Sequence, residues 1–449
     1  MELVKIINAG EFNSYFKAMS HVEEDAAVNA IVNEIIAAVR SEGDIALRRY
    51  AARFEKSVPE KFEIPVEAAK EAWEKIKSAE SELASSLVLA SEHLRRFGEL
   101  QKEQFTSFEA EIEPGLFTGQ RVIPVERAAI YVPAGRFPLI SSALMGLVPA
   151  AVAGVGEKIL VSPPGEDGKP DRRILACAYL AGVDRIFALG GAQAIAALAI
   201  GTETFPRVDL IVGPGNKYVA AAKRMLFGEV GIDFVAGPSD VLVITDISAV
   251  NMSTQAVGLI AEAADLIAAD MLAQAEHDPD ARARALVPDS VTADYVERAL
   301  KKRLAQLPAE EIAKASLEAG GLIVIYGTKE EAINIANTIA PEHLELHTSS
   351  PNEWISGLKN FGSLFIGSLA VEALGDYSAG INHTLPTSGA ARFTGGLSVR
   401  HFLKTVTTLR CAHGKAYAEA LNAAKIIARA EGLIAHAESA ALRAGLIEG

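Results

Sequence analysis

Short apolar segments alternate with alanine-rich segments from about residue 126 onward, and this alternation constrains the fold more than any other feature. The first apolar set is "AAIYVP", "EKILVSPP", "VDRIFALG" and "VDLIVGPG". The second is "FVAGPSDVLVITD", "RARALVP", "GLIVIYG", "LELHTS" and "GSLFIG", with helices expected near 251–276, 291–306 and 328–340. Because parallel strands need a crossover connection, usually a helix, the pattern predicts an α/β fold of two doubly wound, Rossmann-like units.

The flanking segments have helical periodicity instead. Apolar residues recur at helical spacing in 22–54 and 65–105, and again from about residue 400 to the end of the sequence. We therefore expect a helical N-terminal region over 1–125 that packs partly on the second α/β unit. Rossmann-like units should follow over 126–236 and 237–395, and then a helical C-terminal tail over 396–449.

Composition excludes several classes of protein. The 449 residues suit two or three domains, and a 50% hydrophobic content is enough for large cores. The net charge of −14 argues against nucleic acid or an anionic membrane as a partner. Only two cysteines occur, without a CxxC pair, and the first residues do not resemble a signal peptide, so we expect a cytoplasmic protein. Pro149 interrupts the apolar run 139–156, which favours a buried helix over a membrane span.

Glycine-rich turns follow several expected strands: "GGAQA" after residue 189, "GPGNKY" after 212 and "AGPSD" after 235. None is a GxGxxG or P-loop fingerprint, and any one of them could be an ordinary tight turn. Ligands of open α/β sheets bind at the carboxyl ends of strands. Three such turns in series therefore favour a backbone that closely approaches a ligand.

Histidines and carboxylates gather in the second half of the chain. The helix end "MLAQAEHDPD" places Gln274 and His277 three residues apart, and therefore on one helical face. "PEHLELH" contains Glu342 and His343, and "GDYSAGINH" contains Asp376 and His383. The spacing of His343 and His347 could form a metal pair on a helix, but the alternation "LELH" favours a strand. From spacing alone, metal ligation and ordinary hydrogen-bonded core histidines both remain open.

Seven stretches give the chain a close resemblance to the histidinol dehydrogenase family from about residue 25 onward. They are "YVPAGRFPLISSALM", "GGAQAIAALAIGTE", "GPGNKYVAAAKR", "GIDFVAGPSDVLVI", "LAQAEHDPDA", "APEHLEL" and "EALGDYSAGINHTLPTSGAARFTGGLSV". The resemblance implies a homodimer that oxidises L-histidinol to L-histidine in the last steps of histidine biosynthesis. It also implies two NAD molecules per turnover and one Zn²⁺ per site.

The resemblance also implies a role for individual residues. Glu342 and His343 would form the acid–base pair, and the C-terminal tail would reach into the partner's site. The implied zinc ligands are Gln274, His277, Asp376 and His436, which would also lie against the substrate. The other implied substrate contacts are Ser239, His343, His383 and Glu431, and the implied NAD contacts are Tyr131, Gln193 and Asn216.

Some positions leave alternatives open. The chain has Asp240 where the family usually has glutamate, and "YVPAGRFPLISS" and the segment 240–273 also depart from the usual pattern. Glu372 is retained, which favours histidinol. The alternatives are a related enzyme for another small polar alcohol, such as a sulfopropanediol, and a binding protein that has lost catalysis. Cys177 and Cys411 do not favour a thioester route, since neither has a partner base nearby in the sequence.

Overall fold

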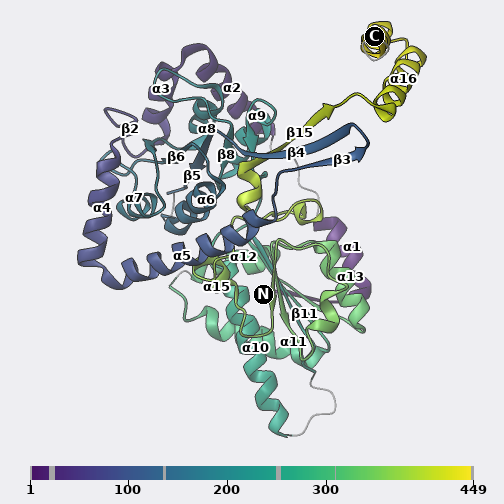
Figure 1. Cartoon of the computed structure of the whole chain (residues 1–449). Coiled ribbons are helices and arrows are strands. Elements are labelled where there is room, and N and C mark those ends of the chain that lie inside the picture. Colours follow the sequence, from purple (N-terminus) through teal and green to yellow (C-terminus); the bar gives the residue numbers. More distant parts are fainter. Residues whose placement is uncertain (1–2, 20–25, 135–137, 249–253, 309, 446–449) are drawn as a thin grey trace.

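The computed structural model describes residues 3–19, 26–134, 138–248, 254–308 and 310–445. Two α/β units lie one above the other in Figure 1, and a long antiparallel ribbon leads away from them to the last two helices. Each unit is built on a six-stranded sheet, so the predicted pair of doubly wound units is confirmed. In the described residues, no helix has the length and apolar character needed to cross a membrane.

The first α/β unit has the strand order β2-β7-β6-β5-β8-β9, parallel except for β2. Its strands are β2 (Glu63–Ile64), β5 (Arg127–Tyr131), β6 (Glu157–Ser162), β7 (Arg185–Ala188), β8 (Leu210–Val212) and β9 (Gly231–Ile232). Its crossover helices are α6 (Ile140–Ala153), α7 (Arg172–Leu180), α8 (Gly191–Ile200) and α9 (Lys217–Leu226). Alternate residues of β5 enter different cores, with Ile130 facing α6 and α7 and Tyr131 facing α8 and α9.

The second α/β unit is parallel throughout, with the order β1-β12-β11-β10-β13-β14. Its strands are β1 (Lys5–Asn8), β10 (Asp240–Thr245), β11 (Arg282–Val287), β12 (Leu322–Ile325), β13 (His343–His347) and β14 (Ser363–Ile366). Its helices are α1 (Ala9–Met19), α10 (Thr254–Ala275), α11 (Ser290–Leu304), α12 (Glu310–Gly320), α13 (Lys329–Ile339), α14 (Asn352–Ile355) and α15 (Glu372–Tyr377). Helices α10 to α12 cover one face of the sheet, and α1 and α13 cover the other.

The N-terminal region divides between the two units. β1 pairs with β12 at the edge of the second sheet, and α1 covers that sheet. The next four helices cover the first sheet instead. These helices are α2 (Ala26–Glu42), α3 (Asp44–Phe54), α4 (Val66–Ala79) and α5 (Ser81–Glu103). The sequence predicted only helix here. It missed β1 because a four-residue strand is recognised only by its partner, which lies more than 300 residues away.

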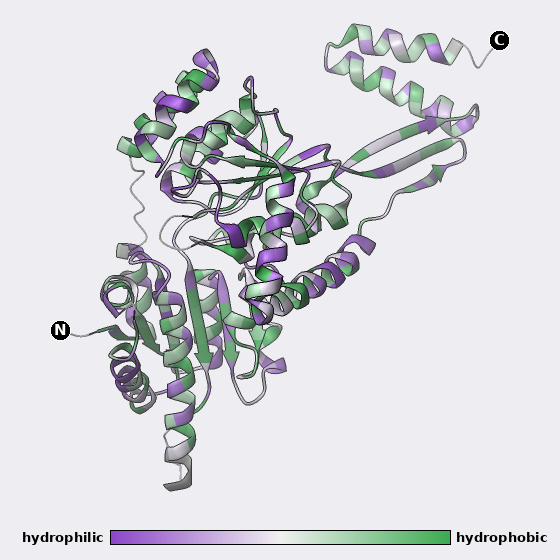
Figure 2. Cartoon of the chain, turned by 90° about the vertical axis from the view of Figure 1, so that its left-hand side faces the viewer, coloured by the Kyte–Doolittle hydropathy of each residue, from purple (hydrophilic) through white to green (hydrophobic). Residues whose placement is uncertain are grey.

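The antiparallel ribbon corrects the expected tail. The ribbon has the order β15-β4-β3, formed by β3 (Phe108–Glu113), β4 (Leu116–Pro124) and β15 (Leu403–Cys411). The prediction of helix from about residue 400 was therefore wrong for β15, because its nine residues all pair with β4. The tail becomes helical at α16 (Lys415–Ala430) and α17 (Ile434–Gly445). These helices project away from both units and carry exposed apolar residues such as Ile426 and Leu442 (Figures 1 and 2).

The segment 233–239 joins the last strand of the first sheet to the first residue of β10. The expected strand "FVAGPSDVLVITD" therefore begins only at Asp240. Gly237 and Pro238 precede it, and proline cannot donate to a sheet ladder. The "AGPSD" turn thus follows a carboxyl end of the first sheet and precedes an amino end of the second.

Candidate functional site

Glu342 and His343 lie at the amino end of β13, next to Asp240 at the start of β10. The backbone N–H of Glu342 donates to Asp240 Oδ1 at 3.0 Å, and the backbone N–H of Asp240 donates to Glu342 Oε2 at 3.1 Å. This reciprocal pair holds the Glu342 carboxylate in one position. Burial raises the pKa of Glu342 to about 7, so its protonation changes near neutral pH.

A buried arginine completes this arrangement. Arg284 Nη1 donates to Asp240 Oδ2 at 3.1 Å, and both side chains are only 8% exposed. Burial raises the pKa of Asp240 although the positive charge of Arg284 opposes the rise. Sequence reasoning missed Arg284, because its partner Asp240 lies on another strand, 44 residues away.

His343 faces three carboxylates. Its Nδ1 lies 4.0 Å from Glu342 Oε2 and 3.8 Å from Glu372 Oε1, and its Nε2 lies 3.4 Å from Asp376 Oδ1. Burial favours the neutral imidazole, but Glu372 and Asp376 outweigh burial and raise the pKa of His343 well above its usual value. Burial also raises the pKa of Glu372 to about 8. Several titratable groups with shifted pKa values therefore surround His343, which is typical of a site where protons are transferred.

Two of these groups, together with His277, can share a metal ion. One ligand atom each from His277, Glu372 and Asp376 lies within 4.8 Å of the others. Gln274, one turn earlier on α10, has a buried Oε1 without a hydrogen-bond partner among the described residues. Nitrogen and oxygen donors of this kind suit zinc, so the residues fit the implied metal. Sequence reasoning did not predict that the carboxylate of Glu372 would lie beside His277; only the structure shows this.

The remaining acidic residues at this helix end do not join the group. Asp278 Oδ1 instead accepts a hydrogen bond from the backbone N–H of Asp280 at 3.0 Å. Glu276, Asp278 and Asp280 are all exposed. Their carboxylates therefore form a solvated helix end, as the sequence indicated.

His383 connects this group to the first α/β unit. Its Nδ1 donates to the carbonyl oxygen of Asp376 at 2.9 Å, and its Nε2 accepts from Ser142 Oγ at 3.1 Å. Ser142 lies in the first turn of α6, the helix that follows β5. The carboxyl edge of the first sheet thus meets the His343 group, which lies at the amino edge of the second. The expectation of carboxyl-edge ligands applies only to the first sheet.

Two of the three expected dinucleotide contacts lie together at that carboxyl edge. Tyr131 OH accepts from the backbone N–H of Gly191 at 3.0 Å. Gln193 Nε2 donates to Glu55 Oε1 at 3.4 Å, and the same oxygen accepts from Gly190 N–H at 2.8 Å. Glu55 belongs to the segment after α3, and sequence reasoning missed it because 135 residues separate it from Gly190.

Asn216 lies after β8, the neighbour of β5. Its side chain caps α9 by accepting from the N–H groups of Tyr218 and Val219 at 3.0 and 3.2 Å. The chain leaves β5 in one direction toward β6 and returns on the other side at β8, so β5 and β8 flank the switch point of the sheet. Gly213 is required here: it has φ +113°, and a Cβ would lie 2.1 Å from the carbonyl oxygen of Tyr131.

Ser239 directly precedes Asp240, whereas Glu431 and His436 lie apart from the His343 group within one chain. Ser239 is in the linking segment, where its carbonyl oxygen accepts from the backbone N–H of Arg282 at 3.0 Å. Glu431 and His436 are exposed on the projecting tail, far from α10 and α15 in Figure 1.

Comparisons with known proteins indicate the same family over nearly the whole chain. A family model described as histidinol dehydrogenase matches residues 18–444. Histidinol dehydrogenase from Thermus thermophilus is 45% identical over 93% of this chain and 95% of its own length. The protein of that name from Methylococcus capsulatus is 42% identical over 94% and 92%. The crystal structure of histidinol dehydrogenase from Elizabethkingia anophelis matches with a TM-score of 0.89, 31% identity and full coverage of both chains.

Proposed function

The chain belongs to the histidinol dehydrogenase family, a family of oxidoreductases, and we propose that it oxidises L-histidinol to L-histidine through the aldehyde with NAD as acceptor. The observation that carries this proposal is the placement of His343 between Glu342, Glu372 and Asp376, beside the His277 group. Oxidation of an alcohol by hydride transfer requires a base that takes the hydroxyl proton, and this arrangement provides one.

The reaction consists of two hydride transfers. In the first, the alcohol loses its hydroxyl proton to a base while hydride passes to one NAD⁺, which gives the aldehyde. Water then adds to the aldehyde, and the hydrate loses hydride to a second NAD⁺ and a proton to a base. Together one alcohol, two NAD⁺ and one water give one carboxylate, two NADH and three protons.

His343 and Glu342 divide the proton transfers. His343 takes the hydroxyl proton in its neutral form, which requires that the negative charge of Glu372 and Asp376, which raises the pKa of His343, be offset when substrate is bound. Glu342 activates the water that adds to the aldehyde, and its pKa of about 7 leaves a substantial fraction ionised at neutral pH. Asp240 keeps the Glu342 carboxylate in place for this task.

Gln274, His277 and Asp376 would hold a zinc ion, with His436 of a second copy of the chain as the fourth ligand. A bound zinc would anchor the imidazole and amine of the substrate, and its charge would offset the carboxylates that hold a proton on His343. Ser239, His383 and Glu431 would complete the substrate site. This arrangement requires a homodimer with shared sites, in which the projecting tail reaches the partner.

NAD would lie at the switch point of the first sheet, against Tyr131, Gln193 and Asn216. A thioester route has no support, because Cys177 is completely buried and burial raises the pKa of its thiol to about 12. Cys411 is exposed on β15, away from the His343 group. The reaction chemistry and the composition agree with a cytoplasmic biosynthetic enzyme.

Substrate-dependent NADH formation tests the proposal. We expect two NADH for each L-histidinol consumed and none from a sulfonated propanediol. NADH formed only with the diol would assign the chain to the alternative substrate, and no NADH with either would reject catalysis in favour of a binding role.

A further inference from the structure

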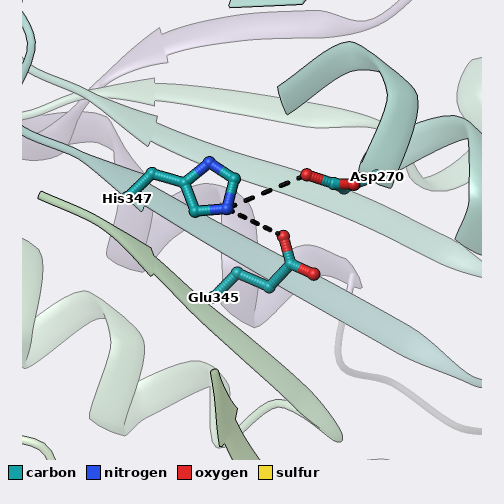
Figure 3. Close-up of side chains that lie close together, drawn as sticks. All are labelled: Asp270, Glu345 and His347. Atoms are coloured by element: carbon teal, nitrogen blue, oxygen red, sulfur yellow. Dashed lines mark ion pairs between the residues drawn. The ribbon is translucent and has the colours of Figure 1, made fainter. Parts of the chain in front are cut away.

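A second group of side chains that could hold a metal ion lies farther along β13 than His343. It consists of Asp270 on α10 and Glu345 and His347 on β13, and Figure 3 shows the three side chains pointing toward one another. His347 Nε2 lies 3.3 Å from Glu345 Oε2 and 3.8 Å from Asp270 Oδ2. Glu345 and His347 share the face of β13 that also carries His343, because side chains two residues apart on a strand point the same way.

The group is closed to solvent and rich in negative charge. Glu345 is completely buried, and His347 and Asp270 are 6% and 7% exposed. Burial and the nearby carboxylate of Glu345 raise the pKa of Asp270 to about 9. Two adjacent buried carboxylates therefore cannot both be ionised unless a cation offsets them.

The other charged groups near the cluster do not supply that cation. Glu372 adds negative charge, and its backbone N–H occupies Glu345 Oε1 at 2.8 Å. Arg303 lowers the pKa of Asp270 but is held by both carboxylate oxygens of Asp265, at 2.7 and 2.5 Å. A metal-free ion pair of His347 with Glu345 and Asp270 is the arrangement against which the metal site is tested.

Two atoms of the cluster point to a bound ion. Glu345 Oε2 and His347 Nε2 are buried and face each other at 3.3 Å, and neither makes a hydrogen bond of normal geometry among the described residues. Zinc bonds of 2.0–2.2 Å at tetrahedral angles place neighbouring ligand atoms roughly 3.3–3.6 Å apart. The separations of 3.3 and 3.8 Å are close to that range, so a small shift of Asp270 would allow all three to bind one ion.

We propose that Asp270, Glu345 and His347 bind a second divalent transition-metal ion. One imidazole with two carboxylates favours zinc or a similar ion over calcium or magnesium, which prefer oxygen ligands alone. The site uses other side chains than the His277 group, and the two groups adjoin where the backbone N–H of Glu372 donates to Glu345 Oε1. The ion would fasten α10, which carries Gln274, to β13, which carries His343. Its role is structural and does not depend on the proposed reaction.

Anomalous diffraction from crystals of the full chain grown with Zn²⁺ tests the site directly. Data collected above and below the zinc edge should show a peak about 2 Å from His347 Nε2, in addition to one at the His277 group. A peak at the His277 group with none beside His347 would overturn the proposal.

Metal content of variants gives an independent measurement. After equilibration with Zn²⁺ and removal of excess, the wild-type chain should retain about two zinc ions, and His347→Gln or Asp270→Asn about one. His277→Ala should also lose one, but from the other site. His413→Gln, which changes an exposed histidine outside both groups, should retain the wild-type content. Equal zinc in the His347→Gln and wild-type chains would contradict the proposal.

Discussion

Asp376 faces His343 across 3.4 Å, measured from Oδ1 to Nε2, so an expected metal ligand and an expected base are direct neighbours. The same aspartate presents its carbonyl oxygen to His383, which in turn contacts Ser142 of the first α/β unit. Asp376 therefore lies where the amino edge of one sheet meets the carboxyl edge of the other. A substrate bound there would lie beside the candidate base and the candidate metal-ligating residues, next to the first α/β unit.

Replacing Glu342 with glutamine should separate the two oxidation steps. Because Glu342 has a pKa of about 7, it is protonated and cannot act as a base at lower pH. The wild-type rate of histidine formation from histidinal should therefore rise with pH up to about 7 and then level off. Glu342→Gln should remove this dependence and slow the step by about a hundredfold or more.

Histidinal supplied directly provides the measurement, with histidinol-dependent NADH formation as the comparison. The alcohol step should be less affected in Glu342→Gln, whereas His343→Asn should slow both steps. An undiminished rate from histidinal in Glu342→Gln would exclude Glu342 as the residue that activates water.

Removing a ligand of the His277 group should release zinc. His277→Ala and Asp376→Ala should each lower the bound zinc by about one ion per chain, because both side chains converge on one point. Metal analysis of the purified variants measures this loss. Asp278→Ala, an exposed carboxylate one residue from His277, serves as the control and should keep its zinc. Wild-type zinc content in both ligand variants would remove the ligand assignment.

Arg284→Met should destabilise the second α/β unit. The change leaves Asp240 buried without its arginine, and breaking a buried ion pair from one side costs about 3–5 kcal/mol. Arg298→Met is the matched control. Arg298 is 68% exposed and lies 3.9 Å from Asp294, which is a weak surface ion pair, so this change should cost less than about 0.5 kcal/mol. Urea unfolding at a fixed protein concentration compares the two. A loss below about 1 kcal/mol for Arg284→Met would mean that Asp240 is stabilised without Arg284.

Mixed dimers should recover activity from inactive parents. If His436 serves the partner's site, a dimer of one His436→Ala chain and one Asp376→Ala chain has one site with both defects and one with none. Random exchange should then restore roughly a quarter of the wild-type activity, because about half of the dimers are mixed. Mass spectrometry confirms the exchange independently. Continued inactivity after exchange would place His436 in its own chain's site.

The local pattern of the sequence was sufficient for the units of the fold. Alternating apolar and alanine-rich segments located the main strands of both sheets, because hydrophobic periodicity is a property of neighbouring residues. The same local reasoning placed Gln274 and His277 on one helical face. In the structure α10 ends at Ala275, and His277 follows in a turn where its backbone N–H donates to the carbonyl oxygen of Gln274 at 3.3 Å. The alternation in "LELH" was likewise enough to predict a strand next to Glu342 and His343.

Only the tertiary structure brought distant segments together. Glu372 joins His277, Arg284 pairs with Asp240, and Glu55 meets Gln193, in each case across tens of residues or more. β1, β15, and β3 and β4 of the region expected to be helical were missed, because a strand's backbone hydrogen bonds are made to another segment, which the sequence around it does not specify. The projection of α16 and α17 was decided in the same way, since their path follows from the pairing of β15 with β4.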